Sequence, residues 1–203
     1  MGAFRRMFGP SRKEVWQQLS REMGARFVEG GFAKPDKVQV THGEWTVTLD
    51  TYAVHTGKTT IVFTRMRAPY VNPDGFRFRV HRRGFFSDIG KALGMQDVEV
   101  GQAGFDEDFI IKGTDEGKLR QLFANPKIRE LIDAQKDIDF SVKDDEGWFG
   151  ATFPDGVDEL VFQVGGVLKD IDRLKLLYEL FAETLDELCR MGSAYRSDPH
   201  VQL

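Results

Sequence analysis

The sequence is poor in cysteine, with Cys189 alone among 203 residues. One cysteine rules out an intrachain disulfide and gives no support for an oxidising compartment. Long apolar runs are also missing, since stretches such as 160–164 are far shorter than the ~20 residues needed to cross a bilayer, and no secretory segment follows the start. We therefore expect a cytoplasmic protein with no transmembrane segment.

Recognisable catalytic and metal-binding motifs are absent as well. Residues 57–59 read Gly-Lys-Thr, like the end of a phosphate-binding loop, but Tyr52 stands where the first glycine of that loop is required. The sequence has no Gly-x-Ser-x-Gly elbow, and its histidines have no partner at metal-ligand spacing. We expect no metal and no cofactor, and a non-enzymatic role is favoured while enzymatic activity stays open.

The first residues mix Phe4, Met7 and Phe8 with arginines, which could suggest an anchor at a membrane interface. Arg6 occupies the position where a myristoylation signal needs Ser or Thr, and the segment is too short for a stable amphipathic helix. We interpret residues 1–11 as a flexible arm, with peripheral membrane contact as the alternative.

What the sequence does contain is an ordinary globular composition, with 41% apolar and 30% charged residues. The 17 phenylalanines predict a Phe-rich core. Apolar spacing and turn residues predict the secondary structure. Helices are expected at 12–29, 85–94, 115–123, 126–135 and 171–192, and strands at 38–40, 45–49, 61–63, 76–80, 109–112, 138–142, 148–153 and 160–164, with a strand and loop over 97–104.

This order predicts an α+β fold, in which two antiparallel β-meanders carry helices packed on one face and a long amphipathic helix comes last. We expect one domain over residues 12–192, followed by a disordered tail at 193–203. The meanders resemble each other, so residues 12–95 and 105–192 could be halves of a tandem duplication. The limited variety of hairpins would explain the likeness equally well.

Charge is distributed unevenly along the chain. Residues 58–84 contain seven basic residues and one acid, giving +6, while the other 176 residues contain 21 basic and 31 acidic residues, giving −10. Strict alternation in residues 76–81 places Arg77, Arg79 and His81 on one strand face. The candidate residues for binding an anion or a partner are Arg65, Arg67, Arg77, Arg79, His81, Arg82 and Arg83.

Guanidinium groups on such a face could hold phosphates or another anionic ligand. They could equally pair with the protein's own surplus of carboxylates or with a second subunit. A pI near 5.6 argues against nucleic acid as the partner. Secondary candidates are acids in two clusters, with a tryptophan beside the second: Asp106, Asp108, Asp144, Asp145, Glu146 and Trp148. The simpler interpretation of both clusters is solvated turns.

Four segments resemble an uncharacterised bacterial domain family of unknown function. They are residues 90–101, which read GKALGMQDVEVG, residues 105–113, which read FDEDFIIKG, residues 144–150, which read DDEGWFG, and residues 156–163. The resemblance implies a bacterial source and supplies no activity, cofactor or catalytic residue. Some proteins of that kind carry the domain beside membrane-spanning segments, which implies peripheral association here if a membrane is involved at all.

These observations favour a non-enzymatic binding or interaction module, with a protein partner or a second copy of the chain as its expected contact. An enzyme acting on an anionic, phosphorylated small molecule is one alternative, with the arginines holding substrate and Asp106 or Asp108 as acid/base groups. A peripheral membrane adaptor is the other, based on the N-terminal arm and the basic segment.

Overall fold

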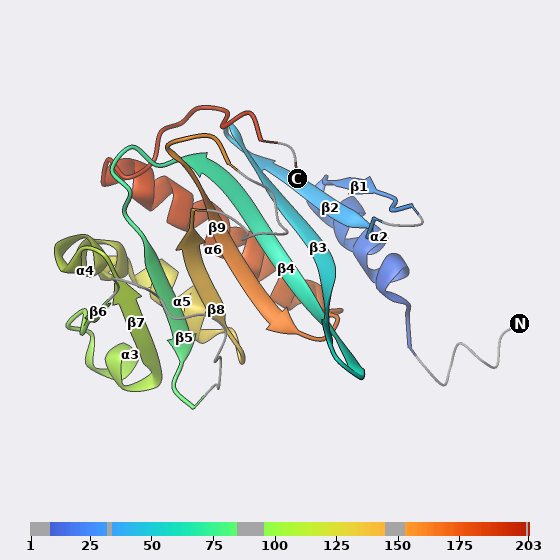
Figure 1. Ribbon diagram of the computed structural model, residues 1–203, viewed down its shortest axis with the longest axis horizontal. Helices are drawn as coiled ribbons and strands as arrows, with labels where there is room; N and C mark the ends of the chain where they lie inside the picture. The colour runs from blue at the N-terminus through green and yellow to red at the C-terminus, as the bar shows by residue number, and fades with distance from the viewer. Residues whose placement is uncertain (1–8, 32–33, 85–95, 145–152, 202) are drawn as a thin grey trace, which may run out of the picture.

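A computed structural model describes residues 9–31, 34–84, 96–144, 153–201 and 203. Its strands form one nine-stranded sheet in the order β1-β2-β3-β4-β9-β8-β5-β7-β6. Every strand pairs antiparallel with its neighbours, as Figure 1 shows. The α+β class and the antiparallel pairing are therefore confirmed. The first four strands join the rest of the sheet where β4 pairs with β9, and β5 lies beyond β8, away from the other strands of the predicted first meander.

The strand bounds extend most of the predicted segments. The strands are β1 (Arg26–Val28), β2 (Lys37–His42), β3 (Trp45–Thr56), β4 (Thr59–Val71), β5 (Phe78–Arg82), β6 (Gln96–Asp97), β7 (Phe109–Gly113), β8 (Asp139–Lys143) and β9 (Val157–Gly165). β3 and β4 are the longest of these, because the β-branched run around their turn continues the hairpin well past the apolar residues that identified it. The helix predicted at 85–94 and most of the strand predicted at 148–153 lie outside the described residues.

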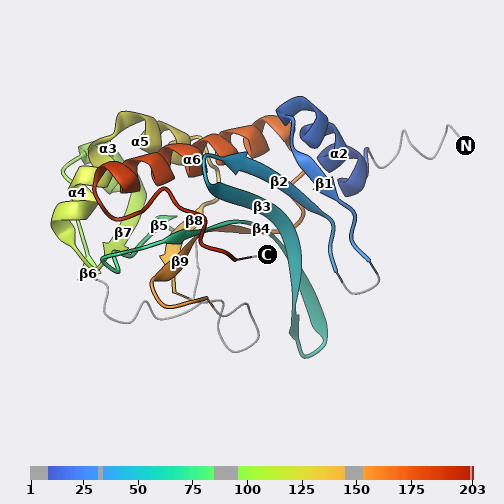
Figure 2. The same ribbon diagram turned by 90° about the horizontal axis from the view of Figure 1, so that it is seen from above.

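Helices cover one face of the sheet, as Figure 2 shows. They are α2 (Arg12–Met23), α3 (Ala103–Asp108), α4 (Glu116–Ala124), α5 (Pro126–Asp133) and α6 (Ile171–Arg190). No helix in the described ranges is long and apolar enough to cross a membrane. Asn125 caps α5 and Pro126 opens it, as predicted, whereas α4 is capped by Asp115 and not by Thr114.

The first helix is shorter than predicted. Its capping box at Ser11 and Glu14 forms as expected, but Gly24 adopts a left-handed conformation with φ 62° and ends the helix there. Residues 26–28 then pair with β2 as an edge strand. The predicted helix was too long because its apolar stripe includes Phe27, and a single apolar residue fits a strand and a helix equally well.

Phenylalanines connect the sheet to the helices, as the composition predicted. Phe78 on β5 makes edge contacts with Phe123 on α4 and Phe140 on β8, and Phe140 in turn contacts Phe181 on α6. All four side chains are fully buried. The helical face of the sheet is therefore the apolar core, and polar side chains at alternate strand positions must lie on the other face.

The chain halves 12–95 and 105–192 do not form separate sheets. β5, from the first half, lies between β8 and β7 of the second half and pairs with both. The tandem duplication stays a prediction, but any two such halves now share one sheet and one core.

The C-terminal segment departs from the expectation of disorder over 193–203. In its described part, Ser193 and Ala194 are buried and Tyr195 forms a bridge to Val71 at the end of β4. Val201 and Leu203 are half-buried. Among the described residues, β4 has no strand neighbour on that side after Arg67, where its pairing with β3 ends. The Val71 carbonyl is therefore open to the bond that the Tyr195 N–H donates.

Candidate binding site

The face of the sheet that carries no helix is polar, and we call it the open face. It carries charged and polar side chains from strands far apart in the sequence. Its central members are Lys37, Gln39, Thr48, Asp50, Arg65, Arg67, Arg79, Asp139, Ser141, Lys143, Glu159 and Gln163. Several of these are buried although they are charged, so their partners decide what the face can bind.

Asp50 on β3 neutralises two of the predicted anion-binding arginines. Arg65 donates to both Asp50 carboxylate oxygens at 3.0 Å from Nε and Nη2, and Arg67 donates to Oδ2 at 2.8 Å. The exposed fraction is 2% for Asp50 and 4% for Arg67. This buried, bidentate arrangement fixes the side chains. The Nε and Nη2 donors of Arg65 both contact an internal carboxylate and not an external ligand.

The network continues across the sheet to a third predicted arginine. The Tyr52 hydroxyl donates to the Gln163 amide oxygen at 3.0 Å, and the Gln163 amide nitrogen donates to Asp139 at 2.8 Å. Arg79 donates to both oxygens of Asp139, at 2.8 and 3.0 Å. Arg65 also lies over the Tyr52 ring, 4.9 Å from its centre. We call Asp50, Arg65, Arg67, Arg79, Asp139 and Gln163 the paired block.

Two further charged groups lie beside the paired block, opposite each other on β8 and β9. Glu159 is 2% exposed, and within the described part of the chain its Oε2 has no hydrogen-bond partner. Burial raises the pKa of Glu159 to about 7, although Arg67 and Arg65 oppose this. Burial lowers the pKa of Lys143, its cross-strand neighbour. Both groups are thus shifted toward their neutral forms.

Pro69 sets the shape of the sheet next to the paired block. The β3–β4 ladder stops at Thr48 and Arg67, two residues before Pro69, while β4 continues its pairing with β9 to Val71. Proline has no N–H to donate, so it cannot continue a ladder on both sides. The strands separate on that side, and the C-terminal segment lies along β4 instead.

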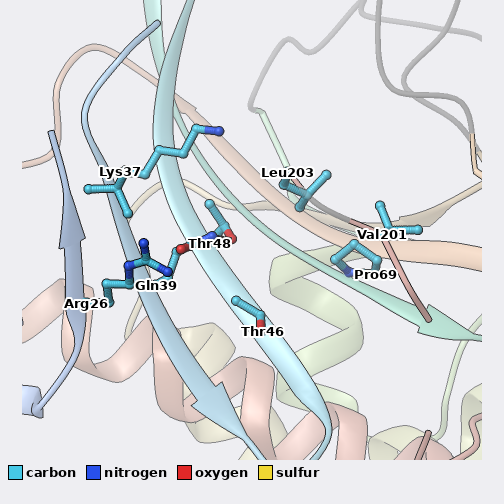
Figure 3. Close-up of a pocket in the computed structure, with 9 residues that line it drawn as sticks. Arg26, Lys37, Gln39, Thr46, Thr48, Pro69, Val201 and Leu203 are labelled. Atoms are coloured by element: carbon cyan, nitrogen blue, oxygen red, sulfur yellow. Dashed lines mark hydrogen bonds between the residues drawn. The ribbon is translucent and has the colours of Figure 1, made fainter. Parts of the chain in front are cut away.

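A hollow of about 340 Å³ lies on the open face at this separation, shown in Figure 3. Polar side chains from β1, β2 and β3 stand on one side of it, and Pro69, Val201 and Leu203 stand on the other. Its lining residues are Arg26, Val28, Lys37, Gln39, Thr46, Thr48, Pro69, Val201 and Leu203. The hollow is therefore cationic and hydroxyl-rich on one side and apolar on the other.

The two cations of the hollow differ from those of the paired block. Among the described residues, neither Arg26 nor Lys37 has a carboxylate within ion-pair distance. Burial lowers the pKa of Lys37, and the nearby Asp50 opposes this only in part. An anion entering the hollow would favour the charged form of Lys37 and find two cationic donors without a described carboxylate partner.

Sequence reasoning missed both cations, for different reasons. Lys37 directly precedes Val38, so the alternation that identified the strand also placed Lys37 and Gln39 on the polar face. The position of Lys37 could therefore be predicted. The position of Arg26 could not, because the apolar pattern places residue 26 in the first helix and its strand exists only through pairing with β2.

The other predicted basic residues do not share one surface. His81 lies on the open face, where burial lowers its pKa. Arg77 pairs with Asp158 and with Asp144, at 3.2 and 2.9 Å. Arg82 faces the helical side, over the Phe109 ring at 4.6 Å, and donates to the end of α5.

The acidic candidates are also separated from the paired block. Asp106 accepts three backbone N–H bonds from Val100, Gly101 and Gln102, which makes it a loop-stabilising residue. The predicted Arg83 donates to the carbonyl of Asp106, and Asp108 is 3.8 Å from Arg82.

Asp145, Glu146 and Trp148 lie outside the described residues. In the ranges that are described, no group of three or more His, Cys, Asp or Glu side chains is placed to hold a metal ion.

No family model and no curated protein matches the chain, in keeping with its resemblance to an uncharacterised family. Among solved structures, its fold is similar to that of the mycobacterial trehalose monomycolate transport factor A, TtfA. The two chains are 7% identical, the match covers 94% of this chain and 98% of that chain, and the TM-score is 0.53. At this identity the likeness concerns the fold alone, and it extends over nearly the whole of both chains.

Proposed function

We propose that the protein is a non-enzymatic binding module that takes an anionic group with an apolar portion in the hollow of the open face. The observation that carries this proposal is the contrast between cations on one face. Arg65, Arg67 and Arg79 contact internal carboxylates, whereas Arg26 and Lys37 line a hollow with no such partner among the described residues.

The lining of the hollow favours binding over catalysis. Its described residues supply two cations, an amide, two threonine hydroxyls and apolar side chains. Their side chains include no carboxylate, imidazole or thiol to transfer a proton or to form a covalent intermediate. Arg65, Arg67 and Arg79, which the enzyme alternative needs as a substrate clamp, already donate to internal carboxylates, and this weighs against that alternative.

The comparison with a known structure agrees with a binding role. A mycobacterial protein of similar fold is named a trehalose monomycolate transport factor. A fold that serves one transport factor is compatible with a carrier or accessory role here, for an anionic molecule or for an acidic segment of a protein partner. A bacterial, cytoplasmic setting stays a prediction.

The test is a titration of the full chain, followed by backbone amide NMR, with sodium decanoate as the probe. Acetate and decanol serve as the anion-only and chain-only comparisons. We expect decanoate to bind more tightly than either, with the largest shifts at Arg26, Lys37 and Thr48. The double variant Arg26→Glu with Lys37→Glu should weaken decanoate binding at least about tenfold, because hydrogen bonds to charged groups contribute roughly 1.5–3 kcal/mol each.

The matched control is Arg120→Glu, which reverses an exposed cation on α4, on the helical face. It should bind decanoate like the unmodified chain. The control reverses one charge and the double variant reverses two. If the control shows half or more of the double variant's loss of binding free energy, net charge governs binding and the hollow would lose its role.

A further inference from the structure

The β3–β4 hairpin extends beyond every other strand of the sheet, and Figure 2 shows it leaving the body of the molecule. β2 pairs with β3 only over Trp45–Leu49, and β9 pairs with β4 only from Phe63 onward. In the described part of the chain, hairpin residues 53–62 form strand pairs only with each other, and Val62, at the base of the hairpin, also accepts a backbone bond from Gly166. A two-stranded ribbon in water is marginally stable by itself, so this projection is a candidate for association.

The projecting hairpin carries exposed apolar side chains among threonines and very few charges. Val54 and its cross-strand neighbour Ile61 are 39% and 42% exposed, and Val62, on the other face, is 37% exposed. No carboxylate occurs from Thr51 to Pro73, and Lys58 is at the turn. Exposed strand edges without charges close by lack the usual protection against pairing with another strand.

The free backbone edge identifies the kind of partner. Along Tyr52–Thr56 the outer edge of β3 has no neighbouring strand among the described residues, so its outward N–H and C=O groups are open to pairing. Hydrocarbon cannot satisfy such groups, and the turn at 56–59, Thr-Gly-Lys-Thr, is polar. A polypeptide strand therefore fits this edge better than a lipid surface does.

We propose that the outer edge of β3 pairs antiparallel with the same edge of a second copy of this chain, about a twofold axis at Val54. This register places Val54 opposite the second copy's Val54, and Tyr52 opposite the second copy's Thr56. His55 lies opposite the second copy's Ala53, so no like charges meet. Registers shifted toward Asp50 are blocked, because β2 occupies that edge up to Leu49.

The paired region is short, five residues on each copy. It buries much less than the roughly 800 Å² per partner of a stable interface, so we expect a dissociation constant of about 0.1 mM or weaker. A twofold contact uses the same surface on each copy. Because that surface is a strand edge, the pairing would still join the two sheets into one continuous sheet.

Sedimentation velocity on the full chain tests the proposal. The protein concentration should run from about 20 µM to about 1 mM, which brackets the expected dissociation constant. The weight-average mass should rise toward that of a dimer. Val54→Lys, which sets two lysines directly opposite each other, should abolish the rise. Val62→Lys is the matched control, because it changes the same residue type at nearly the same exposure on the other strand, and it should leave the rise intact.

A monomer at every concentration, or equal loss of association in both variants, would overturn the proposal. Crosslinking gives a second test, in which Val54→Cys with Cys189→Ser should form an oxidised dimer and Val62→Cys with Cys189→Ser should not. Flotation of the chain with phosphatidylcholine–phosphatidylserine vesicles, lost equally in both lysine variants, would assign the hairpin to a membrane instead.

Discussion

The paired block and the hollow lie next to each other on the same face of the same sheet, yet their cations are in different states. In the paired block, Arg65, Arg67 and Arg79 donate to Asp50 and Asp139, which are nearly fully buried. In the hollow, Arg26 and Lys37 have no described carboxylate partner. A cluster of basic residues in a sequence therefore does not locate a binding surface, because what matters is whether the fold brings carboxylates to it.

The partners of the paired block come from near and far in the sequence. Asp50 reaches Arg65 and Arg67 across the β3–β4 hairpin, whereas the topology brings Asp139 to Arg79 and Gln163. Asp50 is on β3 and Asp139 on β8, and β9 lies between β4 and β8 in the sheet. The region that carries the excess of positive charge in the sequence is thus neutralised in space by acids from elsewhere. The hollow lies where β3 and β4 stop pairing before Pro69, and no acidic side chain is among its described lining residues.

The largest effect should come from breaking the paired block. Replacing Asp50 by alanine removes the carboxylate that Arg65 and Arg67 share in a buried site. We expect the free energy of unfolding to fall by about 3–5 kcal/mol, the usual cost of removing one partner from a buried ion pair. Urea unfolding followed by circular dichroism measures this.

Asp97→Ala is the control for that variant. Asp97 pairs with Lys112 at 3.0 Å, but its side chain is 72% exposed. Removing an exposed partner should cost between zero and about 1 kcal/mol. Similar losses in the two variants would show that the paired block is an ordinary surface network, and the contrast with the hollow would disappear.

The second effect is a pH dependence at Glu159. Its folded pKa of about 7 lies above the ordinary 4.5, so the folded state binds the extra proton between these values. The stability from this group is fully present below pH 4.5 and is lost as pH rises through 7. Glu159→Gln should remove a decrease of about 3 kcal/mol between these limits, at 1.36 kcal/mol per pKa unit.

The quantity to measure is the difference in unfolding free energy between Glu159→Gln and the unmodified chain, at steps from pH 4.5 to 8. Taking the difference removes the opposite trend from Asp36 and Asp74, whose pKa values are lowered in the fold. A difference that stays constant with pH would mean that Glu159 titrates normally and that burial on this face does not desolvate its charges.

Much of the fold could be predicted from the sequence, because alternation and helix capping are local. The strands of the first meander, the cap at Asn125 and the final amphipathic helix all follow from neighbouring residues. The insertion of β5 between β8 and β7 could not be predicted, since nothing near residues 78–82 specifies partners at 109–113 and 139–143.

The candidate site was only partly predictable for the same reason. Alternation correctly placed Arg79 and His81 on one face, opposite Phe78 and Val80. It could not show that Asp139 would reach Arg79 from β8, or that Arg82 would point to α5 on the other side. Of the two cations of the hollow, Lys37 follows from alternation on β2, whereas Arg26 depends on β1, a three-residue strand that has no signature without its partner.

The smallest effect should come from the hollow itself. Lys37→Met keeps the length of the side chain while removing an amine whose pKa burial already lowers, so no internal ion pair is lost. We expect the free energy of unfolding to change by less than about 0.5 kcal/mol, as for substitutions away from buried networks. Decanoate binding should weaken in the same protein sample, and that combination separates a binding cation from a structural one. A loss of about 2 kcal/mol or more in urea unfolding would instead place Lys37 with the buried ion pairs, through its interaction with Asp50, and the boundary between the paired block and the hollow would have to move.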